Sequence, residues 1–200
     1  SLAQRGICWE VRMPSWSRIA TRMRVPLGFL FAAAYLWFAR PLWSWVLGGG
    51  VLVIAGLGMR AAASGHIRKN RELATTGPYA YTRNPLYLGS ILIAAGFVVA
   101  ARNPWIAVAA LLMFLAIYLP VIKAEETYLR SAFPGYADYA AHVPRLLPRP
   151  VAWRPDRAVV NEDGPRFSSE LYRKHREYQA ALGSVLMIGA LILKMILVNH

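Results

Sequence analysis

Five long apolar segments, separated by polar ones, are the feature that most constrains the fold of this 200-residue sequence. A helix needs about 20 mainly apolar residues to cross the hydrocarbon core of a bilayer, and ~17 is a practical minimum. The first and third segments are short by this standard, although Arg24 and Arg40 can snorkel from the ends of the first. We therefore predict an all-α, polytopic membrane helical bundle of about five transmembrane helices. The segments run over residues 25–39, 42–63, 86–101, 105–122 and 181–198.

The first two segments are predicted to form a tight hairpin that turns at Arg40-Pro41. An alternative joins residues 25–47 into one span, but it leaves only a short apolar run before Arg60. Pro41 and Pro104 stand where new helices would begin, and proline is tolerated at the first helical position. Tryptophans near the proposed ends match an interfacial aromatic belt: Trp37, Trp43, Trp45 and Trp105.

The charge distribution indicates a membrane topology rather than nucleic-acid binding. Hydrophobic residues make up 56% of the chain and charged residues 16%, whereas a soluble domain has close to a quarter of its residues charged. With the N-terminus inside, twenty of the 23 Lys and Arg residues fall on the inner side. Arg40 and Arg102 fall outside, and Lys194 lies late in the fifth span. This positive-inside pattern, with anionic lipid headgroups as partners, accounts for the net charge of +13. We therefore predict a multi-pass protein with its N-terminus on the cytoplasmic side, and no nucleic-acid partner.

Three parts of the chain follow from this pattern: a basic N-terminal segment (residues 1–24), a membrane core (25–150), and a polar segment with a C-terminal transmembrane helix (151–200). Met13 is a candidate natural start, and no cleavable signal peptide is expected because no small-residue cleavage site follows the first apolar run. The single cysteine, Cys8, excludes an internal disulfide, and the four histidines lack metal-ligand spacing, so no metal site is expected.

Two polar stretches, residues 64–84 and 123–179, are predicted to lie on the same inner side, where a membrane enzyme would assemble its site. Each contains an informative motif. GPYAYTRNPLYLG runs from Gly77 to Gly89, and EETYLRSAFPGYADYAAHVPRLLP runs from Glu125 to Pro148.

Together these motifs resemble the membrane methyltransferases that include isoprenylcysteine carboxyl methyltransferase and the phospholipid N-methyltransferases. The pattern of that superfamily is G-x-Y and R-[HN]-P-x-Y-x-G, then E-E-x-x-L, F-x-x-Y-x-x-Y and a late R-x-x-P. The two motifs are separated by one apolar hairpin, and the resemblance covers roughly residues 64–150. The matching residues are Gly77, Tyr79, Arg83, Asn84, Pro85, Tyr87 and Gly89, then Glu125, Glu126, Leu129, Phe133, Tyr136, Tyr139, Arg145 and Pro148.

The resemblance implies an S-adenosylmethionine-dependent methyltransferase that acts on a lipid-borne or prenylated acceptor, at a carboxylate or an amine, with no obligate protein partner evident. A carboxylate suits the ribose hydroxyls or ammonium of the cofactor, an aromatic face attracts its sulfonium, and a helix N-terminus favours an anionic group. Adjacent helical positions point about 100° apart, so one glutamate is expected to reach the cofactor while the other pairs with Arg or Lys. The implied cofactor-binding residues are His66, Tyr79, Arg83, Asn84, Tyr87, Gly89, Glu125 and Glu126, and the implied catalytic residues are Glu126, Tyr139 and Arg145. His66, Lys69 and Leu73 belong to a less specific upstream pattern.

Plainer structural roles remain open for these residues. Arg102-Asn103-Pro104 repeats the tripeptide Arg83-Asn84-Pro85, and Asn before Pro is a good helix start wherever it occurs. The glutamates can be charges at the membrane edge, Arg83 a positive-inside anchor, and the tyrosines part of an interfacial belt. Gly89 lies one turn into a span, where a small residue lets a helix or a ligand approach closely.

The sequence also departs from the family. Prenylcysteine enzymes typically carry His at the position of Asn84, and many members end near the R-x-x-P element, whereas this chain continues to a fifth span. Residues 171–178 can form a basic interfacial helix or simply anchor that span. Two rival functions are carried forward: an NADPH-dependent membrane reductase of the sterol and steroid type, and a non-enzymatic membrane scaffold or transporter component.

Overall fold

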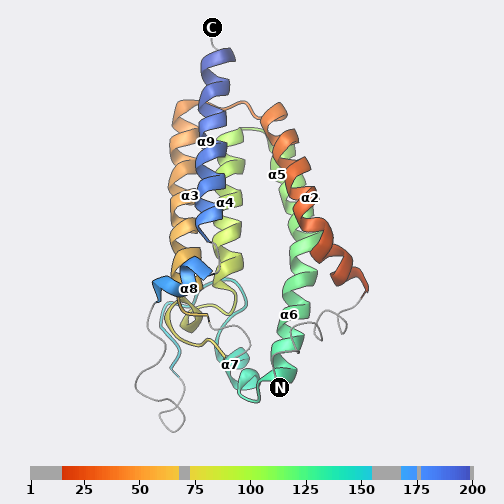
Figure 1. Ribbon diagram of the computed structural model, residues 1–200, viewed down its shortest axis with the longest axis vertical. Helices are drawn as coiled ribbons and strands as arrows, with labels where there is room; N and C mark the ends of the chain where they lie inside the picture. The colour runs from red at the N-terminus through yellow and green to blue at the C-terminus, as the bar shows by residue number, and fades with distance from the viewer. Residues whose placement is uncertain (1–14, 68–72, 155–167, 175–176, 199–200) are drawn as a thin grey trace.

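All five apolar segments form helices in a computed structural model of the protein, which describes residues 15–67, 73–154, 168–174 and 177–198 (Figure 1). No strand occurs among these residues, and the predicted all-α bundle is confirmed. In chain order the elements are α2 (Ser15–Phe38), α3 (Trp43–Ser64), η2 (Gly77–Ala80), α4 (Pro85–Ala101), α5 (Pro104–Met113), η3 (Phe114–Tyr118), α6 (Leu119–Ala132), α7 (Tyr136–His142), α8 (Ser169–Lys174) and α9 (Tyr178–Val198).

Within the described part of the chain, three helical stretches are long and apolar enough to cross a membrane: Trp43–Ser64, Pro104–Ala132 and Tyr178–Leu197. Two apolar helices are shorter, Pro26–Phe38 and Pro85–Ala101, as predicted for the first and third segments. The second long stretch is one continuous helix made of α5, a π-helical turn (η3) and α6.

Two helix boundaries differ from the prediction. Helix α2 begins at Ser15 rather than residue 25, and therefore takes in part of the predicted basic segment. Helix α6 continues past Ile122 to Ala132. Apolarity set the predicted limits, but Ala, Arg, Met, Lys and Glu favour helix in water as well as in lipid, so each helix extends beyond its apolar part.

Helices α3, α4 and α9 lie side by side, with α2 and the α5–α6 helix on the other side of the bundle (Figure 1). Helices α3 and α4 pack most closely because glycines face each other across their contact, as small residues do in membrane helix pairs. A Cβ atom added to Gly56 would lie 2.6 Å from the Gly89 carbonyl oxygen, and one added to Gly96 would lie 2.5 Å from the Gly49 oxygen. The expectation that Gly89 permits a close helix approach is thereby met.

The loop between α2 and α3 and the loop between α4 and α5 are short and are held by hydrogen bonds. The backbone N–H of Arg40 donates to the Ala101 carbonyl oxygen (2.8 Å), which joins the predicted hairpin turn to the end of α4. Asn103 caps α5 by accepting from the Trp105 N–H at 3.0 Å, and its side-chain nitrogen donates to the Phe38 carbonyl oxygen. Lys194 of α9 donates to three carbonyl oxygens at the C-terminal end of α2, those of Leu36, Trp37 and Ala39, at 2.7–2.9 Å.

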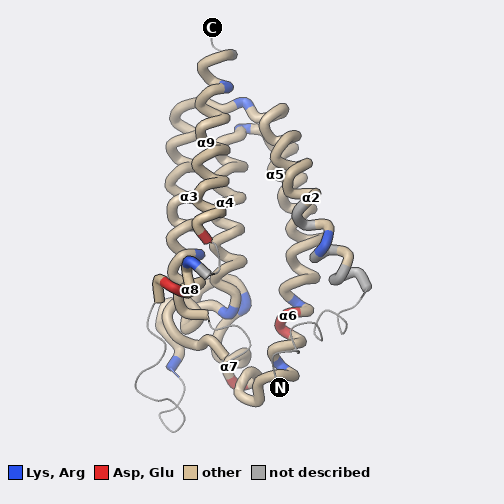
Figure 2. Tube along the Cα trace, in the orientation of Figure 1, with Lys and Arg blue, Asp and Glu red and all other residues tan. Residues whose placement is uncertain are grey.

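The end of the bundle that holds Arg40, Arg102 and Lys194 is called the outer end, and the opposite end, with η2, α7 and α8, the inner end. A core of residues from all five apolar helices closes the outer end: Tyr35, Ala39, Val46, Ala100, Ala101, Ile106, Leu191 and Met195. The acidic residues that the structure describes all lie toward the inner end (Figure 2). Exposed tryptophans lie at the outer end, as expected of an interfacial belt.

Candidate active site

The two polar stretches fold together at the inner end through backbone hydrogen bonds. The N–H of Arg83 donates to the Pro144 carbonyl oxygen at 2.9 Å, that of Arg149 to Tyr81 at 3.0 Å, and that of Trp153 to Ala80 at 2.9 Å. The fully buried Thr82 hydroxyl lies 3.2 Å and 3.1 Å from the carbonyl oxygens of Arg145 and Leu146. The two predicted motifs are therefore one structural unit.

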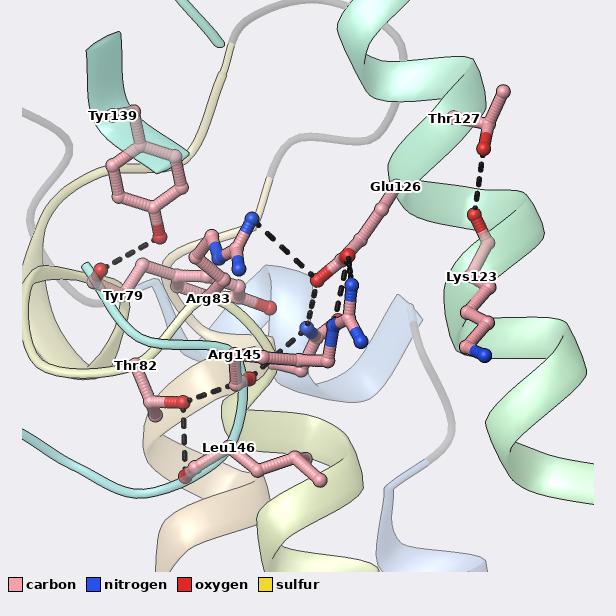
Figure 3. A network of polar contacts seen from close by, with 10 residues as sticks. Tyr79, Thr82, Arg83, Lys123, Glu126, Thr127, Tyr139, Arg145 and Leu146 are labelled. Atoms are coloured by element: carbon pink, nitrogen blue, oxygen red, sulfur yellow. Dashed lines mark hydrogen bonds and ion pairs between the residues drawn. The ribbon is translucent and has the colours of Figure 1, made fainter. Parts of the chain in front are cut away.

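Glu126 is the centre of this unit (Figure 3). Its Oε2 atom accepts from Nε and Nη2 of Arg145 at 2.9 and 2.7 Å, and its Oε1 atom accepts from Asn84 at 3.1 Å. Arg83 Nη1 lies 3.8 Å from Oε1. Glu126 is only 7% exposed, and charged and hydrogen-bonding partners of this kind offset the cost of burying a carboxylate.

Asn84 connects the two motifs instead of capping its helix. Its side chain makes no cap hydrogen bond to α4, and its amide nitrogen donates to Glu126 and to the Arg145 carbonyl oxygen. Asn103, which has the same neighbours in sequence, is a true N-cap. Identical Arg-Asn-Pro tripeptides thus have different roles because only one of them meets a buried carboxylate.

The two adjacent glutamates point to different partners, as their helical spacing predicts. Glu125 is exposed and accepts a hydrogen bond from the Tyr87 hydroxyl at 3.1 Å. The Tyr87 ring in turn packs edge to face against Tyr118, on the π-helical turn, at a centroid distance of 6.4 Å. Tyr87 therefore links α4 to the α5–α6 helix, close to the pair formed by Glu126 and Arg145.

Tyr79, Tyr136 and Tyr139 are buried in the same region. The Tyr139 hydroxyl donates to the Tyr79 carbonyl oxygen at 2.7 Å, which fixes the short helix η2. Burial, with smaller contributions from Glu125 and Tyr139, raises the pKa of Tyr79 far above the usual tyrosine value. The Tyr79 hydroxyl therefore stays protonated near neutral pH, and among the residues described it has no hydrogen-bond partner.

Hydrogen bonding to Glu126 raises the pKa of Arg145, whose side chain is 41% exposed. Arg145 is accordingly a permanent cation, oriented on one side by the carboxylate and open to solvent on the other. Arg83 is more deeply buried, and its Nε atom also lacks a partner within the described part of the chain.

Gly77 packs directly against the His66 ring, and both its backbone conformation and the space available favour glycine. Gly77 has φ +59°, a left-handed conformation that favours glycine, and an added Cβ would lie 2.6 Å from the His66 ring. His66 Nδ1 lies 2.8 Å from the Ala62 carbonyl oxygen. Of the other residues in the upstream pattern, Leu73 packs against the Tyr136 and Tyr139 cluster, and Lys69 lies outside the described residues.

Sequence reasoning gave no site role to three residues of this region, although it included Tyr136 among the motif matches. Thr82 joins the motifs, Tyr136 contributes a buried ring beside Tyr139, and Arg60 forms an ion pair with Glu177. The position of Arg60, alone at the end of an apolar run, indicated that it needs a partner. The sequence did not show that this partner lies 117 positions away.

The assembled site offers an oriented cation, a paired buried carboxylate, an exposed carboxylate and several aromatic rings. Such a set can hold a small ligand that carries both charges and can orient an anionic reactant. No group of three or more His, Cys, Asp or Glu among the described residues is arranged to hold a metal ion.

Comparison with known proteins gives one family match. Residues 45–135 match the family described as phospholipid methyltransferase. The chain is 33% identical over 128 residues to the cobalt-zinc-cadmium resistance protein CzcN of Cupriavidus metallidurans, covering 60% of this chain and 59% of that protein. It is also 33% identical over 107 residues to the nickel-cobalt-cadmium resistance protein NccN of Alcaligenes xylosoxydans xylosoxydans, covering 50% of each. The chain thus spans less than two thirds of either relative. No solved structure gives a significant match.

Proposed function

We propose that this protein is an integral membrane, S-adenosylmethionine-dependent methyltransferase of the superfamily that includes isoprenylcysteine carboxyl methyltransferase, because residues 45–135 match the phospholipid methyltransferase family. Its acceptor is a lipid-borne or prenylated molecule with a carboxylate or an amine. The observation that carries the proposal is the buried Glu126, which Asn84 and Arg83 of one motif and Arg145 of the other approach together.

The residues present fit the proposed methyl donor. The Tyr79 hydroxyl and Arg83 Nε are buried hydrogen-bond donors that have no partner among the described residues, and they suit the carboxylate or hydroxyl oxygens of the methyl donor. Glu125 is the exposed carboxylate, suited to its ammonium or ribose hydroxyls, and Tyr87 lies within hydrogen-bonding distance of Glu125. When bound, S-adenosylmethionine would supply the activated methyl group. Asn84 and Gly89 act here mainly by fixing the start of α4, and His66 by packing against Gly77.

Arg145 is proposed to orient the acceptor. Its guanidinium is held by Glu126 and partly open, so it can pair with a carboxylate or a phosphate of a lipid-borne acceptor. The resemblance also implies a catalytic role for Tyr139. Because its hydroxyl is bonded to the Tyr79 carbonyl oxygen, we propose that Tyr139 acts by positioning Tyr79. A correctly aligned pair of reactants gains up to ~7–11 kcal/mol of the barrier from orientation alone.

We propose that the inner end, with this site, faces the cytoplasm, and that the N-terminus lies on the same side of the membrane. The proposal is supported by the distribution of Lys and Arg along the sequence, and by the excess of these residues toward the inner end among those described (Figure 2). Membrane lipids are the surroundings of the bundle, and nucleic acid is not a proposed partner. The names of the two relatives concern metal resistance, and neither name states an acceptor.

The proposal is tested by binding of S-adenosylhomocysteine to the detergent-purified protein, measured by calorimetry and by thermal shift. We expect saturable binding and a raised melting temperature, with NADPH giving neither in the same assay. Binding of NADPH alone would favour the reductase, and binding of neither would favour a scaffold or transporter component. Incubation of membrane-lipid extracts with a radiolabelled methyl donor, followed by chromatography, would then identify the acceptor.

A further inference from the structure

Arg60, near the inner end of α3, joins three helical segments. Its Nε and Nη2 atoms donate to the two carboxylate oxygens of Glu177 at 2.9 and 3.0 Å, in a paired geometry that is among the strongest for an ion pair. Its remaining nitrogen, Nη1, donates to the Ser90 hydroxyl and lies 3.4 Å from the Leu86 carbonyl oxygen. Glu177 immediately precedes α9, so one guanidinium connects α3, the beginning of α4 and the beginning of α9.

The motif glycine Gly89 makes this connection possible. A Cβ atom at position 89 would lie 2.6 Å from Arg60 Cγ, so only glycine lets the arginine side chain pass close to α4. The arginine therefore reaches Glu177 across the same turn of α4 that carries the family motif.

The connection lies next to the proposed donor site. Leu86, whose carbonyl oxygen faces Arg60, packs with its side chain against the cluster of Ala63, Ala74 and Tyr79. Asn84 and Tyr87 flank Leu86 on the same first turn of α4. A second tie, from the Ser168 N–H to the Gly65 carbonyl oxygen at 3.0 Å, brings the start of α8 to the end of α3.

The pair is sheltered enough for its charge to matter. The side chain of Glu177 is 10% exposed and that of Arg60 is 24% exposed. Removal of the glutamate charge would leave a partly buried arginine uncompensated, and such a cation tends to seek another partner or water. A displaced Arg60 would release the first turn of α4 and, with it, the surroundings of Tyr79.

We propose that Glu177 is a positioning residue for methyl-donor binding, so that the C-terminal helix α9, which lies outside the matched domain at residues 45–135, completes the site. This inference rests on the proposed function. Glu177 acts through Arg60 and the first turn of α4, and it is not assigned a contact with the substrate.

The test compares the full-length wild-type protein with Glu177→Gln, and with Glu170→Gln as a control. Glu170 is an exposed acid on the neighbouring helix α8. S-adenosylhomocysteine binding is measured by calorimetry on monodisperse protein, with KM for donor and acceptor where turnover is measurable. We expect Glu177→Gln to weaken donor binding about tenfold while the acceptor KM stays within about twofold. Glu170→Gln should behave as wild type.

Equal donor affinity in wild type and Glu177→Gln would overturn the inference while leaving the proposed function intact. Equal losses for donor and acceptor would also overturn it, because they indicate general damage. If Glu177→Gln yields no folded protein, Glu177→Asp replaces it, because aspartate retains the charge on a shorter side chain. The same result is expected, with weaker donor binding and an acceptor KM within about twofold of wild type. Failure of the wild-type protein itself to bind S-adenosylhomocysteine would instead refute the proposed function.

Discussion

At the scale of single residues, the site depends on the partners of one carboxylate that is shielded from water. Glu126 is nearly buried, and three side chains from two distant motifs surround it. Replacing one partner of a buried charged pair commonly lowers the unfolding free energy by about 3–5 kcal/mol, because the remaining charge is left uncompensated. The partly open side of Arg145 reduces this cost here, since water can reach the guanidinium.

Glu126→Gln is therefore expected to weaken S-adenosylhomocysteine binding by at least about tenfold, because Arg83 and Arg145 lose the charge that orients them. Asn103→Ala is the matched comparison, since it removes the helix cap of the repeated Arg-Asn-Pro tripeptide. It should lower the unfolding free energy by about 1 kcal/mol and leave ligand affinity unchanged. Calorimetry and thermal melting in one detergent separate the two effects. Similar and negligible changes in affinity for both variants would count against the site.

At the scale of helices, the α3–α4 pair depends on glycines that face each other. An added Cβ at Gly56 would lie 2.6 Å from a backbone oxygen of α4, whereas nothing lies within 4 Å of an added Cβ at Gly58. The two positions lie on the same helix, two residues apart, so they differ mainly in what they face.

Gly56→Ala should lower the unfolding free energy by about 1–3 kcal/mol, because the two helices must separate to admit the methyl group. Gly58→Ala should be neutral or stabilising by roughly 0.5–1 kcal/mol, because alanine favours the helix. The midpoint of thermal unfolding in a single detergent measures both. If the two variants melt at the same temperature, close packing at Gly56 is not what holds these helices together.

The sequence predicted the helices better than their ends or their internal irregularities. Five apolar runs led to five helices because a segment in lipid must satisfy its own backbone hydrogen bonds. The π-helical turn at Phe114–Tyr118 has no such signal, since one extra residue within a turn leaves the apolar run uninterrupted. Helices α2 and α6 run on into polar sequence for the reason already given, that helix propensity and apolarity are different properties.

For the candidate site, the motifs predicted which residues gather but not which atoms meet. Spacing showed that Glu125 and Glu126 point in different directions, yet it did not show which of them meets Arg145. Asn84 matched a helix start in sequence, and only the buried carboxylate on another helix explains why its side chain turns away from α4. Pairings such as Arg60 with Glu177 depend on tertiary packing, which no local pattern records.

At the scale of the whole molecule, the two ends of the bundle differ in charge and in side-chain type. The outer end has exposed tryptophans and few of the described Lys and Arg residues, most of which lie, like the candidate site, toward the inner end (Figure 2). This difference predicts which end faces the cytoplasm.

Single cysteines in a Cys8→Ser background test that orientation. Leu42→Cys lies in the outer turn and Ala141→Cys on the inner helix α7, and both positions are exposed. In intact bacterial cells a membrane-impermeant maleimide should label Leu42→Cys, and it should label Ala141→Cys only after the cells are permeabilised. The reverse pattern would place the site on the opposite face and contradict the proposed topology.

The bonds from Lys194 to the end of α2 have a consequence for biosynthesis. Helix α2 leaves the ribosome long before residue 194 is translated. The carbonyl oxygens at its C-terminal end therefore receive the hydrogen bonds from Lys194 only after α9 has been synthesised. The first described helix is thus completed by the last one. A chain released before residue 194 would lack the ammonium group that binds these three carbonyl oxygens.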